Sequence, residues 1–299
     1  MEQNQSEGND SQSLTHYLRH QGQAFGINPQ QRESTYVLRR LLDRFYSGTA
    51  YGLQLKGGMA MKFRTEDARY TTDLDLSIEG LPLSDALEML ISGMKSDLDD
   101  GLSFELANIA DRSTTFNQPN RSARQLAVSY QRGGTSVPNL IKIDLVKEQR
   151  LLQPEQASPQ LLLPQQGLPV SEIDLFALPH QIAQKVCGCL EQHNGLPSSR
   201  TKDLLDLAYI AVNFQVSRNE LVMALEFEFE QRGLKIPKTF SPAKSLLAKY
   251  EQEKRRIDSK ALPKDANAAV AMVSGFLALD LLEQRAGKWL PAQQTWDAN

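Results

Sequence analysis

Three aspartates in strand-like segments are the residues of this chain best suited to do chemistry. Asp73 and Asp75 are separated by one residue within the segment 71–78, where polar and apolar residues alternate. Because alternate residues of a strand point to the same face, both carboxylates can hold one divalent cation. Asp144 lies in a later segment with the same alternation, 140–146, and could complete a second metal position. Two such ions activate an attacking hydroxyl and stabilise a leaving pyrophosphate, as nucleotidyl transfer requires.

A diglycine turn precedes the acidic segment. Gly57 and Gly58 separate the apolar run 51–55 from a helix expected to begin near Met59. Because glycine has no side chain, backbone N–H groups of the turn can approach a triphosphate closely, and the positive end of the helix favours the same ligand. Each feature alone has an ordinary structural explanation, since Asp-x-Asp pairs and Gly-Gly turns are common. Their conjunction in this order favours a metal-dependent nucleotidyltransferase.

The elements that must position these residues mix helices and strands in the first half of the chain. Apolar residues at helical spacing predict a helix over 31–46, and a second helix is expected over 84–98. Strands are expected over 51–55, 71–78, 102–109, 125–131 and 140–146. The first half is therefore expected to be an α/β nucleotidyltransferase domain, with a small mixed sheet and helices.

The second half of the chain has a helical period throughout. Helices are expected over 174–192, 201–213, 218–231, 242–256 and 265–284. A Pro- and Gln-rich linker, 153–172, separates the two halves. We therefore expect a flexible tail at 1–13, a nucleotidyltransferase core at 14–152 and an all-α C-terminal domain at 173–299.

Composition excludes several other classes of protein. The 299 residues include 33 Lys+Arg and 36 Asp+Glu, a net charge of −3, so a surface that attracts nucleic acid everywhere is excluded, although a local basic groove is not. Hydrophobic residues at 40% and charged residues at 23% exclude wholesale disorder and fibrous repeats. The mean hydropathy of −0.42 argues against an integral membrane protein, and no membrane partner is expected.

Cysteine spacing and the N-terminal sequence predict a cytoplasmic protein. Cys187 and Cys189 are two positions apart in an expected helix, so their side chains diverge and a mutual disulfide is not expected. The first residues, MEQNQSEGNDSQS, are polar and acidic and lack the apolar region of a secretion signal. Reduced thiols and a cytoplasmic location follow from both observations.

Two motifs resemble the signatures of a known family. They comprise Lys56-Gly57-Gly58-Met59-Ala60 with Arg69-Tyr70-Thr71-Thr72-Asp73-Leu74-Asp75, and Ile182-Ala183-Gln184-Lys185 with Arg200 and Thr201-Lys202-Asp203-Leu204-Leu205-Asp206-Leu207. Over about 37–212 the chain resembles the AbiEii/MenT nucleotidyltransferase toxins, within the polymerase-beta-like superfamily. Met59 stands where the family usually has Thr, and Thr71 where it has Ser. Neither difference removes a charge or a metal ligand.

The second motif places charges on two successive helices. Asp203 and Asp206 are three residues apart, so both face one side of a helix that begins near Thr201. Antiparallel packing of the preceding helix would bring Lys185 near Asp206. From spacing alone, a structural ion pair at a helix–helix seam and a functional pair are both open. The resemblance favours the functional pair, in which Lys185 neutralises nucleotide phosphates and Asp206 orients it.

The resemblance also implies the remaining site residues. The positions that match those regarded as catalytic in the family are Asp73, Asp75, Lys185 and Asp206, so the helical half would contribute to the active site. The residues expected to bind the nucleotide are Lys56, Gly57, Gly58, Arg64, Arg69, Lys202 and Asp203. Arg64 and Arg69 are included because they flank the acidic strand, and solvated charges between two elements are the alternative for both. The expected ligands of Mg²⁺ or Mn²⁺ are Asp73, Asp75 and Asp144.

The family implies a biological role as well. The resemblance implies a toxin of a toxin–antitoxin system, which adds nucleotides from an NTP to an RNA acceptor and meets a cognate antitoxin encoded next to it. Likeness to the MenT branch suggests the tRNA 3′ end as the acceptor, so that aminoacylation and growth would stop. Thr71 matches a hydroxyl residue that the antitoxin phosphorylates in some relatives. A plain β-branched strand residue is the alternative at this position.

Other interpretations stay open at this point. A nucleotidyltransferase with the same site could modify a protein hydroxyl or a small molecule. A non-catalytic binding module is a further alternative, although a decayed site would be expected to lose one of its carboxylates. The basic stretch 232–260 suits RNA phosphates or is a solvated helix face.

Overall fold

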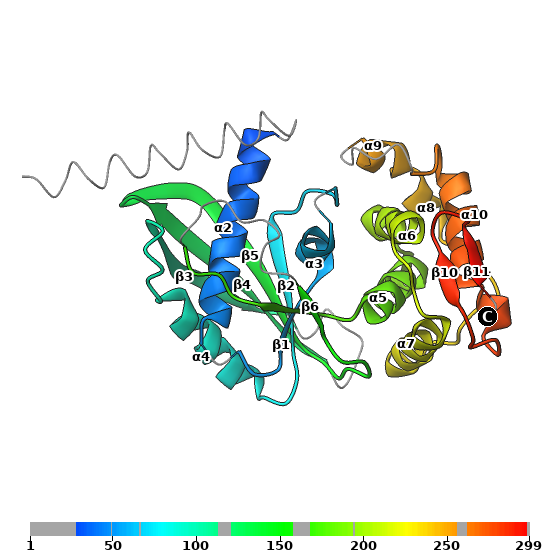
Figure 1. Ribbon diagram of the computed structural model, residues 1–299, viewed down its shortest axis with the longest axis horizontal. Helices are drawn as coiled ribbons and strands as arrows, with labels where there is room; N and C mark the ends of the chain where they lie inside the picture. Colours follow the sequence, from blue (N-terminus) through cyan, green and yellow to red (C-terminus); the bar gives the residue numbers. More distant parts are fainter. Residues whose placement is uncertain are drawn as a thin grey trace, which may run out of the picture. The chain divides into compact units, whose positions relative to one another are not determined.

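The computed structural model describes residues 28–48, 50–65, 67–112, 121–157, 168–193, 195–255 and 262–297. The expected tail at 1–13 lies outside these residues. The chain forms two compact units (Figure 1). The first, here the sheet unit, comprises Met1–Glu66, Tyr70–Gln149 and Pro154–Leu175, and the second, the helical unit, comprises Asp67–Arg69, Arg150–Gln153 and Phe176–Asn299.

A seven-stranded mixed sheet is the centre of the sheet unit, with strand order β3-β4-β5-β2-β1-β7-β6. The strands are β1 (Leu53–Lys56), β2 (Asp73–Ile78), β3 (Leu102–Asp111), β4 (Ser122–Arg132), β5 (Thr135–Lys147), β6 (Glu155–Ala157) and β7 (Ile173–Leu175). Strand β2, which carries the paired aspartates, runs parallel to β5 and antiparallel to β1. The mixed α/β architecture predicted for the first half is confirmed. The sheet is larger than the small one expected, because β6 and β7 add two strands to it.

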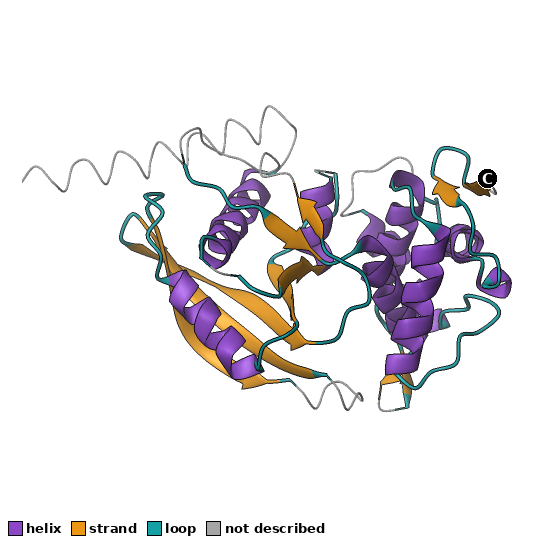
Figure 2. Cartoon of the chain, turned by 60° about the horizontal axis from the view of Figure 1, so that its bottom comes forward, coloured by secondary structure: helices purple, strands orange, loops and turns teal. Residues whose placement is uncertain are grey.

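Among the described residues, three helices accompany this sheet: α2 (Pro29–Tyr46), α3 (Gly57–Arg64) and α4 (Leu83–Met94) (Figure 2). Helix α2 begins where the side chain of Asn28 accepts a hydrogen bond from the backbone N–H of Gln30 at 2.9 Å. One apolar core joins α2, α3 and α4 to the sheet through buried residues such as Leu41, Leu74 and Leu90. Since Leu74 alternates with the aspartates of β2, burying Leu74 directs the carboxylates to the opposite face.

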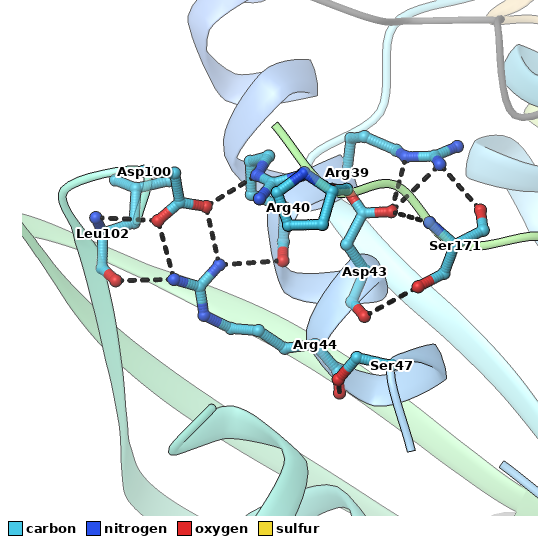
Figure 3. A network of polar contacts seen from close by, with 9 residues as sticks. Arg39, Arg40, Asp43, Arg44, Ser47, Asp100, Leu102 and Ser171 are labelled. Carbon is cyan, nitrogen blue, oxygen red and sulfur yellow. Dashed lines mark hydrogen bonds and ion pairs between the residues drawn. The ribbon is translucent and has the colours of Figure 1, made fainter. Parts of the chain in front are cut away.

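Buried arginines fix α2 to the rest of the sheet unit (Figure 3). They are Arg39, Arg40 and Arg44, each at most 1% exposed. Arg44 donates to both carboxylate oxygens of Asp100, at 2.8 and 2.7 Å. Arg39 pairs with Asp43 and also donates to the carbonyl of Ser171 at 2.8 Å. Because buried charges are tolerated only when they are paired, this network fixes the loops around residues 100 and 171 against α2.

The helical unit is built from six α-helices and one short 3₁₀ helix among the residues that the structure describes. They are α5 (Leu178–Leu190), α6 (Thr201–Asn213), α7 (Arg218–Gln231), α8 (Lys244–Leu247), α9 (Tyr250–Lys254), α10 (Ala266–Leu277) and η2 (Leu279–Leu281). Helix α5 packs against α6 and α7, and α6 also contacts α9 and α10. In the described part of the chain, no helix combines the length and apolar character needed to cross a bilayer.

The expectation of an all-α second half needs correction. Two small antiparallel sheets occur there: β8 (Gln192–His193) with β9 (Leu196–Pro197), and β10 (Lys288–Leu290) with β11 (Thr295–Asp297). Strand β7 also replaces the expected start of the helix over 174–192, because Leu175 pairs with Leu55 of β1. Strands of two or three residues are too short for alternation to reveal them.

Two predicted helices are also interrupted. The helix expected over 242–256 consists of the separate short helices α8 and α9. The helix expected over 265–284 ends at Leu277, because Ala278 adopts a left-handed conformation with φ 42°. Arg218 then donates to the carbonyls of Leu277, Ala278 and Leu281 at 2.8–2.9 Å, which satisfies acceptors that the helix end leaves open.

Candidate active site

The diglycine turn lies directly against the acidic strand. Lys56, the last residue of β1, is in register with Asp75 of β2, and α3 begins at Gly57. Gly57 has φ +69°, and a Cβ atom there would lie 1.9 Å from Oδ2 of Asp75. A Cβ atom on Gly58 would lie 3.0 Å from Cβ of Thr71. Position 57 therefore needs glycine, and a side chain at position 58 would crowd Thr71. The turn thus brings Lys56, Gly57 and Gly58 against Asp75 and Thr71 within the sheet unit.

A polar row crosses four strands of the sheet at this turn. Lys56, Asp75, Asp144 and Gln125 are in register on β1, β2, β5 and β4. Side chains of directly paired residues point to the same face of a sheet, and Asp73 shares that face two residues before Asp75. The row thus places the three predicted carboxylates on one face. Oδ1 of Asp144 accepts a hydrogen bond from Nε2 of Gln125 at 2.8 Å.

The donor set of this face fits a divalent cation that also binds substrate. Mg²⁺ in nucleotide sites usually takes one or two carboxylates and completes its coordination with water and phosphate oxygens. Asp73 is exposed and Asp75 half-buried, so two carboxylates are accessible for this arrangement. Over the described residues, no three His, Cys, Asp or Glu side chains are placed to hold an ion by themselves. A site made by two carboxylates and the nucleotide is therefore the arrangement that the geometry fits.

Glu148 is a buried acid of the sheet unit that the sequence analysis missed. It follows β5 and is 5% exposed. Nζ of Lys56 donates to its Oε1 at 2.6 Å, and Nε of Arg121 donates to its Oε2 at 2.8 Å. Burial alone would raise the pKa of Glu148, but the charges and hydrogen bonds of these two cations lower it to about 2. Glu148 therefore fixes the side chain of Lys56 next to the diglycine turn.

The ion pairs of Glu148 should make stability depend on pH. Because folding lowers the pKa of Glu148 from 4.5 to about 2, its stabilisation is present above pH 4.5 and is lost as pH falls towards 2. We expect Glu148→Gln to lower the free energy of unfolding at pH 7 by about 3 kcal/mol. Between pH 7 and pH 3.5 this difference from wild type should shrink by about 1 kcal/mol, as measured by urea unfolding.

A matched control is available in the same unit. Asp111 pairs with Arg124 at 2.9 Å, and their side chains are 60% and 31% exposed. Asp111→Asn should therefore change the free energy of unfolding by less than about 1 kcal/mol. A Glu148→Gln difference that is equally large at both pH values would show that the loss comes from packing and not from the charge of Glu148.

The second predicted cluster forms within the helical unit. Nζ of Lys185, on α5, donates to Oδ2 of Asp206 at 2.6 Å and to Oδ1 of Asp203 at 3.1 Å. Arg69 donates from Nε to Oδ1 of Asp206 at 2.8 Å and from Nη2 to Oδ2 at 3.0 Å. Lys185 and Asp206 are 7% and 3% exposed. The pairing of Lys185 with the acids of α6 is as the motif predicted, and Arg69 is an additional member.

Electrostatics favour the charged forms of Lys185 and Asp206. Burial would lower the pKa of Lys185, but Asp206 and Asp203 raise it above its ordinary value. Burial would likewise raise the pKa of Asp206, but Lys185 and Arg69 lower it. Gly188 of α5 lies close to this cluster, since a Cβ atom there would lie 2.9 Å from Oδ2 of Asp203. The cluster is thus a compact set of charges held between two helices.

The other predicted nucleotide-binding residues differ in their surroundings. Arg64 donates to Oε2 of Glu155 from Nε at 3.0 Å and from Nη2 at 2.8 Å, so its charge is balanced within the sheet unit. Lys202 is exposed at the second position of α6. In the described chain no disulfide joins Cys187 and Cys189, which are both buried, and burial raises the pKa of the Cys189 thiol.

Comparison with known families agrees with this geometry. A family model described as the nucleotidyl transferase AbiEii toxin of type IV toxin–antitoxin systems matches residues 40–296. The match covers the diglycine turn, the acidic strand and the Lys185 cluster, so the protein is of the nucleotidyltransferase class. The chain belongs to the AbiEii toxin family, as its two motifs predicted.

Two solved structures from Helicobacter pylori are also similar to the chain. The first, JHP933, is 14% identical with a TM-score of 0.47, and the match covers 85% of this chain and 94% of that chain. The second is described as a candidate nucleotidyltransferase; it is 14% identical with a TM-score of 0.44, over 85% of this chain and 97% of that chain. No curated protein matches the sequence.

Proposed function

We propose that this toxin transfers nucleotides from an NTP to the 3′ end of tRNA, which blocks aminoacylation and stops growth. The observation that carries the proposal is the contact between the diglycine turn and Asp75, in a chain that belongs to a family of nucleotidyl transferase toxins. A turn without side chains beside paired carboxylates is suited to a triphosphate and the cation that accompanies it. The choice of tRNA rests on the likeness to the MenT branch.

The residues of the sheet unit bind and orient the triphosphate. Backbone N–H groups at Gly57 and Gly58, together with the first turn of α3, contact the phosphates. Asp73 and Asp75 would hold Mg²⁺ or Mn²⁺, which when bound would offset phosphate charge and make the attacking hydroxyl more acidic. Asp144 lies beside Asp75 and completes the acidic face. Lys56, held by Glu148, contributes positive charge at the turn.

The reaction exchanges one phosphorus–oxygen bond for another. The 3′-hydroxyl oxygen of the acceptor forms a bond to the α-phosphorus of the NTP. The bond from that phosphorus to the oxygen leading to the β-phosphate breaks, so pyrophosphate leaves with its electron pair, and the hydroxyl proton passes to solvent. The protein therefore has to align the two oxygens and stabilise negative charge.

The cluster of the helical unit serves the same reaction in this proposal. Lys185 neutralises phosphate charge, while Asp206 orients it, and the exposed Lys202 and Arg200 extend the positive charge of α6. Two facts support a shared role. Arg69 belongs to the Lys185 cluster and lies four residues before Asp73 in the sequence. The family model spans both the acidic strand and the Lys185 cluster.

The proposal is tested by incubating the purified protein with Mg²⁺, total tRNA and each of the four NTPs in labelled form. We expect label that enters tRNA, is released by ribonuclease, withstands protease and disappears with EDTA. Label released by protease would identify a protein acceptor, and label in a small product would identify a small-molecule acceptor. Absence of incorporation and of metal-dependent NTP binding would leave only the binding-module alternative.

We also propose that the antitoxin encoded next to this gene inactivates the protein by phosphorylating Thr71. The side chain of Thr71 is half-buried and packs against Gly58. A phosphate of about −1.5 to −2 charge there would repel the incoming triphosphate. After co-expression with the neighbouring gene product, intact mass should show one added phosphate that Thr71→Val removes. Neutralisation of the toxin without an added phosphate would contradict the proposal.

A further inference from the structure

Arg69 and Asp206 form a two-bond ion pair within the helical unit. The guanidinium of Arg69 uses Nε and Nη2 to bind the two oxygens of Asp206, at 2.8 and 3.0 Å. The side chain of Asp206 is only 4% exposed and that of Arg69 is 16% exposed, so water screens the pair little. A bidentate pair of this kind fixes the plane of the carboxylate as well as its charge.

The carboxylate of Asp206 is shared between two cations. Lys185 shares Oδ2 of Asp206 with Arg69 and also binds Asp203. The single ammonium of Lys185 lies between two carboxylates, so it cannot balance both of them. Arg69 supplies the second positive charge at Asp206, and Arg200 lies 3.5 Å from Asp203. Arg69 therefore reduces the share of the Asp206 charge that Lys185 must balance.

We propose that Arg69 is a positioning residue, which holds Asp206 in a fixed orientation so that Lys185 can exchange a carboxylate for a phosphate oxygen of the nucleotide as the transition state forms. The inference rests on the proposed function, because it concerns how Lys185 meets its substrate. Without Arg69, the buried charge of Asp206 is balanced by Lys185 alone, and the ammonium stays on the carboxylate. Lysine cannot replace Arg69, because a point charge cannot form both bonds at once.

This role differs from the direct nucleotide contact that the sequence suggests for Arg69. Removal of a residue that touches the nucleotide raises KM. Removal of a residue that acts through Asp206 lowers kcat and leaves KM for the NTP nearly unchanged. The effect of a positioning residue also depends on Asp206, so that it disappears when Asp206 is already changed.

The test compares Arg69→Gln and Arg69→Lys with wild type in steady-state nucleotide transfer. We expect kcat to fall about 10- to 100-fold in both variants, with KM for the NTP changed less than about threefold. Arg69→Gln combined with Asp206→Asn should be no slower than Asp206→Asn alone. Arg285→Gln is the matched control, because Arg285 binds Glu226 on the surface of the same unit. This variant should transfer nucleotides at the wild-type rate.

A second readout does not depend on transfer activity. The ¹⁵Nζ resonance of Lys185, assigned with Lys185→Met, should shift in Arg69→Gln and stay in place in Arg285→Gln. If the resonance shifts while wild type transfers no nucleotide, the proposed function fails and the coupling of Arg69 to Lys185 stands. An unshifted resonance, a rise in KM alone, or rescue by Arg69→Lys would overturn the positioning role.

Discussion

Asp75→Asn should slow nucleotide transfer by at least about 100-fold. The substitution keeps the size of the side chain that packs against Gly57, but it removes the negative charge that holds the cation. Loss of one preorganised electrostatic contact of this kind costs about 10²–10³-fold in rate. The measurement is single-turnover incorporation of labelled NTP into tRNA, together with growth after induction of the toxin.

A control for this prediction lies in the same unit. Asp99 has φ 52°, a conformation that Asn tolerates well, and it is exposed in a loop. Asp99→Asn makes the same change of charge and should transfer nucleotides and arrest growth as wild type does. If Asp75→Asn remains as active and toxic as Asp99→Asn, the acidic strand is not the metal site.

The second large effect is expected for Lys185→Met, which removes the ammonium from its buried cluster. Asp206 keeps its bidentate pair with Arg69, so we expect the fold to survive. Transfer should fall about 10²–10³-fold, because phosphate charge in the transition state loses a fixed cation. Single-turnover rates per folded molecule, with thermal unfolding measured in parallel, check this prediction.

The rate and the stability of Lys185→Met together separate a structural ion pair between Lys185 and Asp206 from a functional one. Lys288→Met serves as the control, since Lys288 is exposed on β10 of the same unit. A structural ion pair would give a Lys185→Met protein that unfolds at lower temperature but transfers at the wild-type rate once the folded fraction is counted. A functional pair gives slow transfer at temperatures where the variant is fully folded.

The elements that hold the acidic face were predictable because their patterns are local. Strand β2 lies within the segment 71–78, whose alternation predicts a strand. Helices α6 and α7 have the limits predicted for them, 201–213 and 218–231. Asp73, Asp75 and Asp144 could be placed on strands for the same reason. Their common face then follows from the register of β2 with β5, which no local pattern contains.

The features that were missed depend on partners far away in the sequence. Glu148 is 92 residues from Lys56 and 27 from Arg121, and a single Glu after a strand carries no signal of either contact. The partner of Arg69 is 137 residues away. The sequence therefore predicts which groups could react, while the ion pairs that hold them become visible only in the folded chain.

The most direct measurement is a crystal of the protein grown with Mn²⁺ and a non-hydrolysable NTP, examined by anomalous scattering. Our account predicts a manganese peak bound by the carboxylates of Asp73 and Asp75 and by phosphate oxygens of the nucleotide, next to Gly57. A nucleotide bound away from that turn, or manganese that contacts neither aspartate, would contradict it.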